Sequence, residues 1–402
     1  MSYLYDEPER SGNIIVDHWK GLYSLPRAFW INNFLISNII ITAIFLGQLA
    51  LSETNLSLQL ISLAGISSIV LGLAVWTWSI VGVWKSADAH QRRGGSASWA
   101  GLAKLAVIFG LLGTAGQLSR QLPGIIETTE LAIGGDSLGN SAELAVVGST
   151  VTVVGTLASG VSLEFSELLE ANGNVRKVVL SSAGGRSIEG TRIGQLIRER
   201  SLDTHVEGNC ESACTLALLA GQRRTASFGS TVGFHQPSFP GTTAVEQAGL
   251  IEDLSQEYSR AGVSFSFIRR AMQASPDEMW YPDETALFEA NVLNAMDSER
   301  VRADQLASAG EINRRAPVRV DDVTVLVGAK ADNNVLRQEF DLSLMANQFD
   351  PSFFHRELAE QLREEVCSIA LVPRLIEAGA IYEYAYRDVA GQEIAIIKID
   401  HC

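Results

Sequence analysis

The sequence has no cluster of lysine and arginine side chains. Its 31 Lys and Arg residues are outnumbered by 46 Asp and Glu residues, and the net charge at pH 7 is -15. Because nucleic-acid phosphates are bound by clustered basic residues, we expect no nucleic-acid partner. The sequence also has no zinc-ligand spacing, no phosphate-binding glycine loop and no ATPase motif. We therefore expect no metal, no cofactor and no ability of this chain to unfold protein substrates by itself.

Cysteine is scarce, and its four positions all lie in the second half of the chain (Cys210, Cys214, Cys367 and Cys402). Four cysteines allow three pairings. Proximity favours Cys210 with Cys214, because positions four apart at a helix start lie within disulfide range. Cys367 with Cys402 would then fix the C-terminus. The alternative is four buried free thiols.

Long apolar runs are confined to residues 1–120, although 47% of the whole chain is hydrophobic. The runs cover residues 34–51, 56–84 and 99–118, close to or above the roughly 20 residues that a bilayer requires. Tryptophan and phenylalanine lie mostly near their ends, as at membrane interfaces. The one charge in the third run, Lys104, lies near its start and can snorkel to the headgroups. We predict three transmembrane helices; the alternative is a soluble helical bundle.

The basic residues predict the orientation of these helices. They precede the first run and surround the connection between the second and third (Lys20, Arg27, Lys85, Arg92, Arg93 and Lys104), whereas residues 52–55 have none. The positive-inside rule places the N-terminus of this multi-pass protein in the cytoplasm. Everything after about residue 120 is then extracytoplasmic, or periplasmic if the source is bacterial. The cysteines agree, because disulfides persist outside the cytoplasm.

The remaining chain divides into three parts. Residues 121–145 are rich in Gly, Ser, Thr and Glu without periodicity and are predicted to be a linker. Residues 146–300 alternate β-branched runs such as "VRKVVLSS" with helical stretches such as "IEGTRIGQLIRER", which predicts βα units and a largely parallel sheet. Residues 301–402 predict a small α+β module with a strand at "DDVTVLVGA", a helix over 354–379 and a hairpin over 380–400. For this module we expect a structural or docking role.

Three short stretches of the middle region carry groups suited to catalysis. Gly184 and Gly185 in "SSAGGRS" follow a strand, where backbone N–H groups can form an oxyanion hole, although a turn alone also favours glycine. Ser212 in "GNCESACTLALLAG" precedes a buried helix, as a nucleophile or as an N-cap. His235 in "GFHQP" is a general base or a structural histidine. Their order within one compact region favours a serine hydrolase.

The stretches "SSAGG", "ESACTLALLAGQRR" and "VGFHQP" resemble the oxyanion turn, nucleophile helix and His-Gln-Pro strand of the proteolytic subunit of Clp protease, in the Clp/crotonase superfamily. The resemblance covers residues 150–297. It implies an α/β Clp/crotonase-like domain of repeated ββα-type units, here preceded by three transmembrane helices and followed by a small α+β module. It also implies assembly into a homo-oligomer.

The resemblance implies a role for each matching residue. Ser212 corresponds to the nucleophile and His235 to the general base. The N–H groups of Gly185 and Ala213 correspond to the oxyanion hole, with Gly184 in support. These roles describe a membrane-anchored serine endopeptidase whose partners are the lipid bilayer and peptide or protein substrates.

The acid of the triad is the position where this sequence departs from the family. Glu278 in "SPDEMWYPDE" matches it best and Asp277 next, whereas the family has aspartate. A glutamate can also orient an imidazole. If the acid is misplaced, the alternative is a catalytically weak or inactive Clp-fold binding or scaffold module. Acyl-CoA chemistry of the crotonase type would require a cytoplasmic domain.

Overall fold

The computed structural model describes residues 9–52, 54, 56–348 and 354–402. The chain divides into two compact units. The first consists of Met1–Gly139 together with the short segment Ser238–Gln247. The second consists of Asn140–Pro237 and Ala248–Cys402, and it contains both β-sheets of the described chain.

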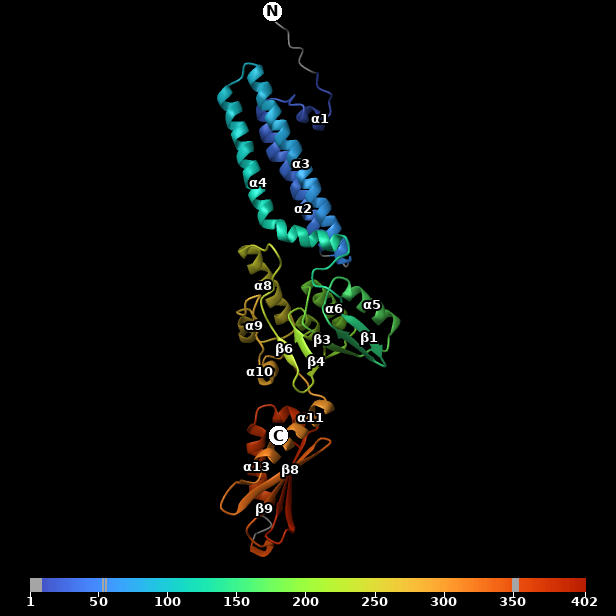
Figure 1. The fold of residues 1–402 in the computed structure, drawn as a ribbon, viewed down its shortest axis with the longest axis vertical. Coiled ribbons are helices and arrows are strands. Elements are labelled where there is room, and N and C mark those ends of the chain that lie inside the picture. Colours follow the sequence, from blue (N-terminus) through green and yellow to red (C-terminus); the bar gives the residue numbers. More distant parts are fainter. Residues whose placement is uncertain (1–8, 53, 55, 349–353) are drawn as a thin grey trace, which may run out of the picture. The chain divides into compact units, whose positions relative to one another are not determined.

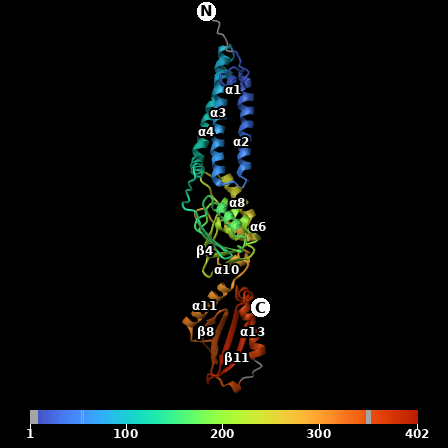
Figure 2. The ribbon, with the colours of Figure 1, turned by 90° about the vertical axis from the view of Figure 1, so that its right-hand side faces the viewer.

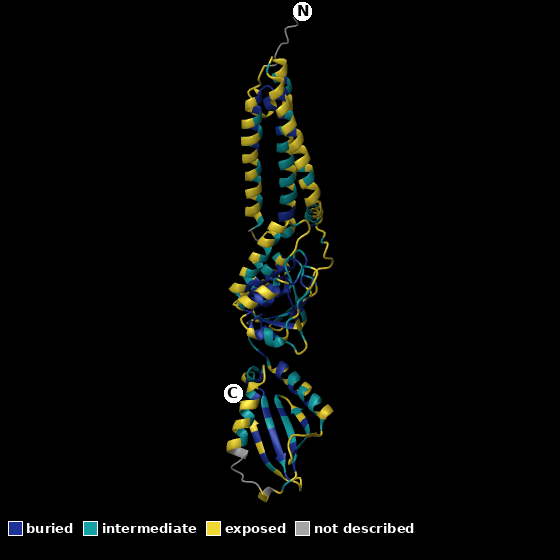
Figure 3. Cartoon of the chain, turned by 90° about the vertical axis from the view of Figure 1, so that its left-hand side faces the viewer, coloured by how far each residue is buried: buried dark blue, intermediate teal, exposed yellow. Residues whose placement is uncertain are grey.

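Three long helices dominate the first unit and lie side by side (Figures 1 and 2). The π-helical segment η1 continues directly into α2, and α3 and α4 follow. All three are long and apolar enough to cross a membrane. Only 6%, 11% and 17% of their most apolar stretches are buried, and exposed residues follow all three helices (Figure 3). Many of these exposed residues are large and apolar. Such a surface is typical of a membrane protein. The elements are α1 (Ile14–Trp19), η1 (Arg27–Ile36), α2 (Ser37–Ser52), α3 (Leu58–Arg92) and α4 (Ala97–Ala132).

Small side chains allow α3 and α4 to pack closely. Val83 and Ala87 of α3 are fully buried in one cluster with Ala100 of α4. Close approach through small residues is the usual way in which membrane helices associate. Lys104 forms an ion pair with Asp88 of α3, so the side chain that we expected to snorkel to the headgroups is neutralised within the helix pair.

The predicted linker over residues 121–145 begins as helix, and this part of the prediction is wrong. Helix α4 continues through Pro123 to Ala132, and the first strand begins only at Glu143. The hydroxyl groups of Thr128 and Thr129 each donate a hydrogen bond to the carbonyl four residues earlier. The prediction rested on Gly, Ser, Thr and Glu residues without periodicity, but the residues after Pro123 remain helical as far as Ala132.

A six-stranded sheet forms the first half of the second unit, and it confirms the predicted α/β region. The strand order is β1-β2-β3-β4-β5, with β6 beside β4; β1 and β2 are antiparallel and the other pairs are parallel. The finer expectation of repeated ββα units stays a prediction. The elements are β1 (Glu143–Val147), β2 (Thr150–Val154), α5 (Val161–Ala171), β3 (Lys177–Ser182), α6 (Ser187–Glu199), β4 (Asp203–Glu211), α7 (Cys214–Leu218), β5 (Arg224–Ala226), β6 (Thr231–Gly233), α8 (Ala244–Arg260), α9 (Phe265–Ala271) and α10 (Glu284–Glu289).

Close packing of α6 against α7 positions the end of β4. Leu180 and Val206 on the strands and Ile193 on α6 are at most 1% exposed, so the sheet and helix share one dry core. Gly190 of α6 lies directly against α7, because a Cβ atom there would be 2.2 Å from the carbonyl oxygen of Ala213. Only glycine permits this approach. The contact of Gly190 with Ala213 therefore fixes the position of the junction between β4 and α7.

A five-stranded sheet with the order β11-β10-β9-β8-β7 forms the C-terminal part (Figure 2). The predicted hairpin is present as β10 and β11, and "DDVTVLVGA" contributes β8. Strand β9 was not predicted. The single helix predicted over 354–379 is interrupted near Leu371, which has φ 70° and stands two residues before Pro373. The elements are α11 (Ser298–Arg315), β7 (Val318–Arg319), β8 (Thr324–Asp332), β9 (Val335–Leu342), η2 (Ala346–Gln348), η3 (Phe354–Leu358), α13 (Ala359–Ser368), α14 (Val372–Glu377), β10 (Ile381–Arg387) and β11 (Glu393–Ile399).

Candidate active site

Ser212 occupies a strained turn between β4 and α7. Its φ angle is 52°, in the left-handed region that residues other than glycine seldom adopt. The turn is held by three hydrogen bonds: the Ser212 N–H donates to the carbonyl of Gly233 (3.0 Å), and the Ser212 carbonyl accepts from the N–H (3.0 Å) and the hydroxyl (2.7 Å) of Thr215. Backbone strain that the surroundings maintain in this way is concentrated at functional sites. The turn presents the Ser212 hydroxyl at the C-terminal end of a parallel strand.

His235 lies beside this hydroxyl because β6 pairs with β4. The register places Glu211 opposite Gly233, so the residues that follow the two strands lie close together. The Nε2 atom of His235 is 2.7 Å from Ser212 Oγ. With the imidazole proton on Nδ1, Nε2 accepts a hydrogen bond from the serine hydroxyl. Two of the three predicted catalytic side chains are thus in direct contact.

The residue before His235 fixes the backbone of the histidine. Phe234 is fully buried and exchanges two backbone hydrogen bonds of 2.9 Å with Trp280. Its ring also packs edge-on against Tyr258 and Phe267, with ring centroids 5.9 and 5.0 Å apart. A histidine attached to such an anchor has little freedom to leave the serine.

The predicted third member of the triad is not brought to the histidine. Glu278 and Asp277 are exposed, and among the described residues no hydrogen bond joins a carboxylate to His235. The Nδ1 atom of His235 is buried and has no hydrogen-bond partner in the described part of the chain. The segment that carries both carboxylates instead pairs through the Trp280 backbone with Phe234. The described site is therefore a serine and histidine pair.

Glu211 is the carboxylate that acts on His235 electrostatically. Burial lowers the pKa of the His235 imidazole below its ordinary value of 6.5, while the backbone of Gln236 and the charge of Glu211 act in the opposite direction. Glu211 itself accepts a hydrogen bond of 3.1 Å from the Tyr281 hydroxyl. Sequence reasoning did not find this residue, although it directly precedes Ser212. With a lowered pKa, the imidazole is neutral near pH 7 and able to accept a proton.

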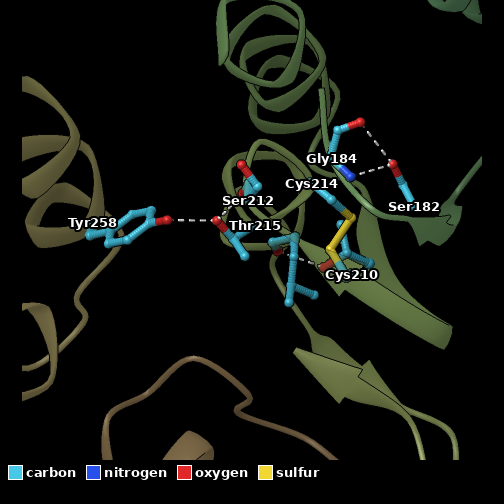
Figure 4. Close-up of a disulfide and its surroundings, with 9 residues drawn as sticks. Ser182, Gly184, Cys210, Ser212, Cys214, Thr215 and Tyr258 are labelled. Carbon is cyan, nitrogen blue, oxygen red and sulfur yellow. Dashed lines mark hydrogen bonds between the residues drawn. A yellow bond between two sulfur atoms is a disulfide. The ribbon is translucent and has the colours of Figure 1, made fainter. Parts of the chain in front are cut away.

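The predicted oxyanion groups differ in their availability. The Gly184 N–H donates to Ser182 Oγ at 3.0 Å, as Figure 4 shows, so it is engaged inside the turn. The N–H groups of Gly185 and Ala213 donate to no described residue. Gly184 lies directly against the nucleophile, because a Cβ atom there would be 2.7 Å from Ser212 Cβ and 3.0 Å from the Ala213 nitrogen. Two unengaged N–H groups therefore flank a tightly packed serine turn.

A disulfide bond encloses the nucleophile. Cys210, near the end of β4, is bonded to Cys214 at the start of α7, with the two Cα atoms 5.3 Å apart (Figure 4). A second bond joins Cys367 to Cys402, and no described cysteine is free. Ser212 is the middle residue of the five spanned by the first bond. The strand and the helix that form the strained turn are thus covalently connected.

A buried tyrosine supports the helix behind the nucleophile. The Tyr258 hydroxyl, on α8, is 2.7 Å from Thr215 Oγ1, which is also bonded to the Ser212 carbonyl (Figure 4). Burial raises the pKa of Tyr258 to about 12, so this hydroxyl remains neutral at any physiological pH. The contact links α8 to the serine turn.

Fold and site together define an α/β protein with a histidine-bonded serine, preceded by three membrane-length helices. No protein-family model matches the chain, and no curated protein does. ClpP1 from Listeria monocytogenes has 16% sequence identity, covering 37% of this chain and 90% of its own, with a TM-score of 0.33. A candidate secreted protein from Pseudomonas aeruginosa has 20% identity (26% and 91% covered, TM-score 0.23), and EpsS, a pilotin of the Vibrio vulnificus type 2 secretion system, has 17% (25% and 89%, 0.23). At these identities the likeness concerns the fold alone.

Proposed function

We propose that this protein is a membrane-anchored serine peptidase. The observation that supports the proposal is the 2.7 Å contact between Ser212 Oγ and His235 Nε2 at a strained strand-to-helix turn. A nucleophile within hydrogen-bond reach of its base is the geometric requirement of this chemistry. Burial keeps the base neutral near pH 7, which is its competent form.

In the proposed reaction, Ser212 Oγ attacks the carbonyl carbon of a peptide bond while His235 Nε2 takes the hydroxyl proton. The Ala213 and Gly185 N–H groups stabilise the negative charge on the carbonyl oxygen. The imidazolium then protonates the leaving amine, and the C–N bond breaks to give an acyl-enzyme. Water, deprotonated by the same imidazole, hydrolyses the ester and restores the serine. Glu211 stabilises the transient imidazolium electrostatically.

The proposed location of the site is the extracytoplasmic face of the membrane. The basic residues around the apolar helices support an inward N-terminus. The two disulfide bonds support an oxidising compartment for the second unit. The substrates proposed are peptides or loosely folded protein segments, since the chain has no ATPase motif for unfolding, and the active form proposed is a homo-oligomer.

Hydrolysis of fluorescein-labelled casein by the full-length protein in detergent tests this function. Ser212→Ala and His235→Ala are each expected to reduce turnover by at least about 10³-fold, because the two side chains act as one unit. Ser266→Ala is the matched control, since Ser266 is an exposed serine on α9 of the same unit. Turnover in Ser212→Ala equal to that of Ser266→Ala would refute the proposal.

One observation favours a second function, that of a binding or scaffold module. His235 Nδ1 has no acceptor among the described residues. A serine hydrolase whose histidine lacks an orienting carboxylate turns over slowly. Unimpaired cellular function of the Ser212→Ala, His235→Ala double variant would support this alternative. Loss of function in the double variant, with normal membrane levels of the protein, would exclude it.

A further inference from the structure

The C-terminal sheet has two chemically different faces. One face carries exposed and half-exposed ion pairs between neighbouring strands, such as Lys330 with Glu339 (2.6 Å) and Arg387 with Asp341 (2.9 Å). The other face is apolar and aromatic, and it faces α13. Between this face and α13 lies a cavity of about 600 Å³. Its volume is within the range of about 300–1,000 Å³ typical of ligand pockets.

Aromatic side chains form one wall of this cavity. Phe340 of β9 stacks on Tyr386 and Tyr384 of β10, with ring centroids 5.0 and 6.1 Å apart. The opposite wall consists of apolar residues of α13, including Leu362 and Val366. These surfaces can bury the apolar part of a ligand, and they resemble the interior of a binding pocket more than a gap in a core.

The charged groups that line the cavity are all acidic. Glu365 of α13 and Asp321 of the β7–β8 turn line it, and no lysine or arginine is among its lining residues. The two carboxylates act electrostatically on the aromatic wall, because burial together with the charges of Asp321 and Glu365 raises the pKa of Tyr386 to about 12. The cavity therefore disfavours anions and favours a cation held near Glu365, with aromatic rings close by.

The wall that carries Glu365 is held in place covalently. Cys367, two residues after Glu365 on α13, is bonded to Cys402 beyond the end of β11, with the Cα atoms 5.7 Å apart. A disulfide that joins a helix to the sheet it covers limits how far the helix can move. A preformed cavity binds its ligand with a smaller entropic cost than one that has to form.

We propose that this cavity binds a polypeptide segment that carries both apolar side chains and lysine or arginine. The apolar side chains enter between α13 and the aromatic wall, and a cationic side chain pairs with Glu365. The role of the site, capture of substrates for Ser212, rests on the proposed peptidase function. The binding itself does not.

Fluorescence anisotropy of a labelled peptide of alternating leucine and arginine tests the proposal. The protein used is full-length Ser212→Ala in detergent, so that cleavage cannot remove the probe. Glu365→Gln, added to this background, is expected to weaken binding by up to about 5-fold, the upper end of the range of about 1.4- to 5-fold that corresponds to exposed ion pairs. Glu364→Gln is the matched control, because Glu364 is the neighbouring exposed residue of α13 and does not line the cavity. Its Kd is expected to be unchanged.

Two further probes distinguish other occupants. A peptide of alternating leucine and glutamate is expected to bind at least about tenfold more weakly than the arginine peptide. Equal affinity for a leucine and serine peptide, or equal effects of Glu365→Gln and Glu364→Gln, would overturn the proposal. If the peptide binds but Ser212 and His235 show no peptidase activity, the proposed binding site stands and only the proposed peptidase function fails.

Discussion

Gly184 is the residue whose substitution tests most sharply how the serine turn is built. An alanine Cβ at this position would lie 2.7 Å from Ser212 Cβ and 2.6 Å from the carbonyl oxygen of Glu211, and the φ angle of Gly184 is +93°. Carbon atoms in contact normally lie about 3.5–4.0 Å apart, so the two segments must separate by about 1 Å. Glu211 and Ser212 lie between two bonded cysteines and pair with β6, so they cannot move away from Gly184 without displacing β6 or the disulfide.

The cost of Gly184→Ala has two parts. A left-handed backbone conformation costs alanine about 1–2 kcal/mol relative to glycine, and overpacking costs about 1–3 kcal/mol. The free energy of unfolding should therefore fall by about 2–5 kcal/mol. A displacement of the nucleophile by about 1 Å should also reduce turnover by about 10²-fold.

Gly229→Ala is the matched control. Gly229 has φ +79°, but an added Cβ there would meet no atom within 4 Å. Only the backbone cost of about 1–2 kcal/mol applies, and turnover should be unchanged. Thermal unfolding in detergent and casein hydrolysis measure the two quantities for each purified variant. Full turnover in Gly184→Ala, or a stability loss no greater than in Gly229→Ala, would refute the close packing of the glycine turn against Ser212.

Two further predictions concern the base and the disulfides. Activity should fall as pH decreases, with a midpoint below 6.5 because burial lowers the pKa of His235; Glu211→Gln removes a charge that raises this pKa and should move the midpoint lower still. A midpoint shifted upward in rate–pH profiles would contradict this role of Glu211. Cys210→Ser opens a disulfide between residues 4 apart in the sequence, so it should lower the free energy of unfolding by about 2 kcal/mol and also reduce turnover. Cys402→Ser opens a disulfide between residues 35 apart, so it should lower the free energy of unfolding by about 4 kcal/mol but leave turnover of a short peptide unchanged. Equal turnover of the two cysteine variants would show that the first bond does not position Ser212.

Local patterns in the sequence predicted much of the fold. The apolar runs identified the three long helices, because a helix surface without charges is visible in composition alone. Alternation of β-branched runs and helical stretches identified the α/β region. Strand β9, "VLRQEFDL", was missed because charged residues of its solvent face, such as Arg337 and Glu339, pair with residues of the neighbouring strands β10 and β8. Such cross-strand pairs form only when the sheet is assembled.

The parts of the candidate site that lie close together in the sequence were predicted, and the contacts between distant segments were not. Ser212 and its flanking cysteines lie within one short stretch, and His235 was placed by an apolar strand next to it. The contact of 2.7 Å between them depends on the pairing of β6 with β4, which the sequence does not display. The acid could not be located, because family position alone suggested Glu278, whereas the backbone pairing of Trp280 with Phe234 determines where that loop lies. Glu211 was missed because its effect on His235 acts through space.

The most direct test of the central claim is covalent labelling of the detergent-solubilised protein by a fluorophosphonate probe, followed by mass mapping of the modified peptide. Activation of the Ser212 hydroxyl by His235 predicts a single adduct on Ser212, absent from Ser212→Ala and formed at least about 10³-fold more slowly in His235→Ala. Labelling of Ser212→Ala at the same rate as the wild type, or no labelling of either protein, would contradict the account.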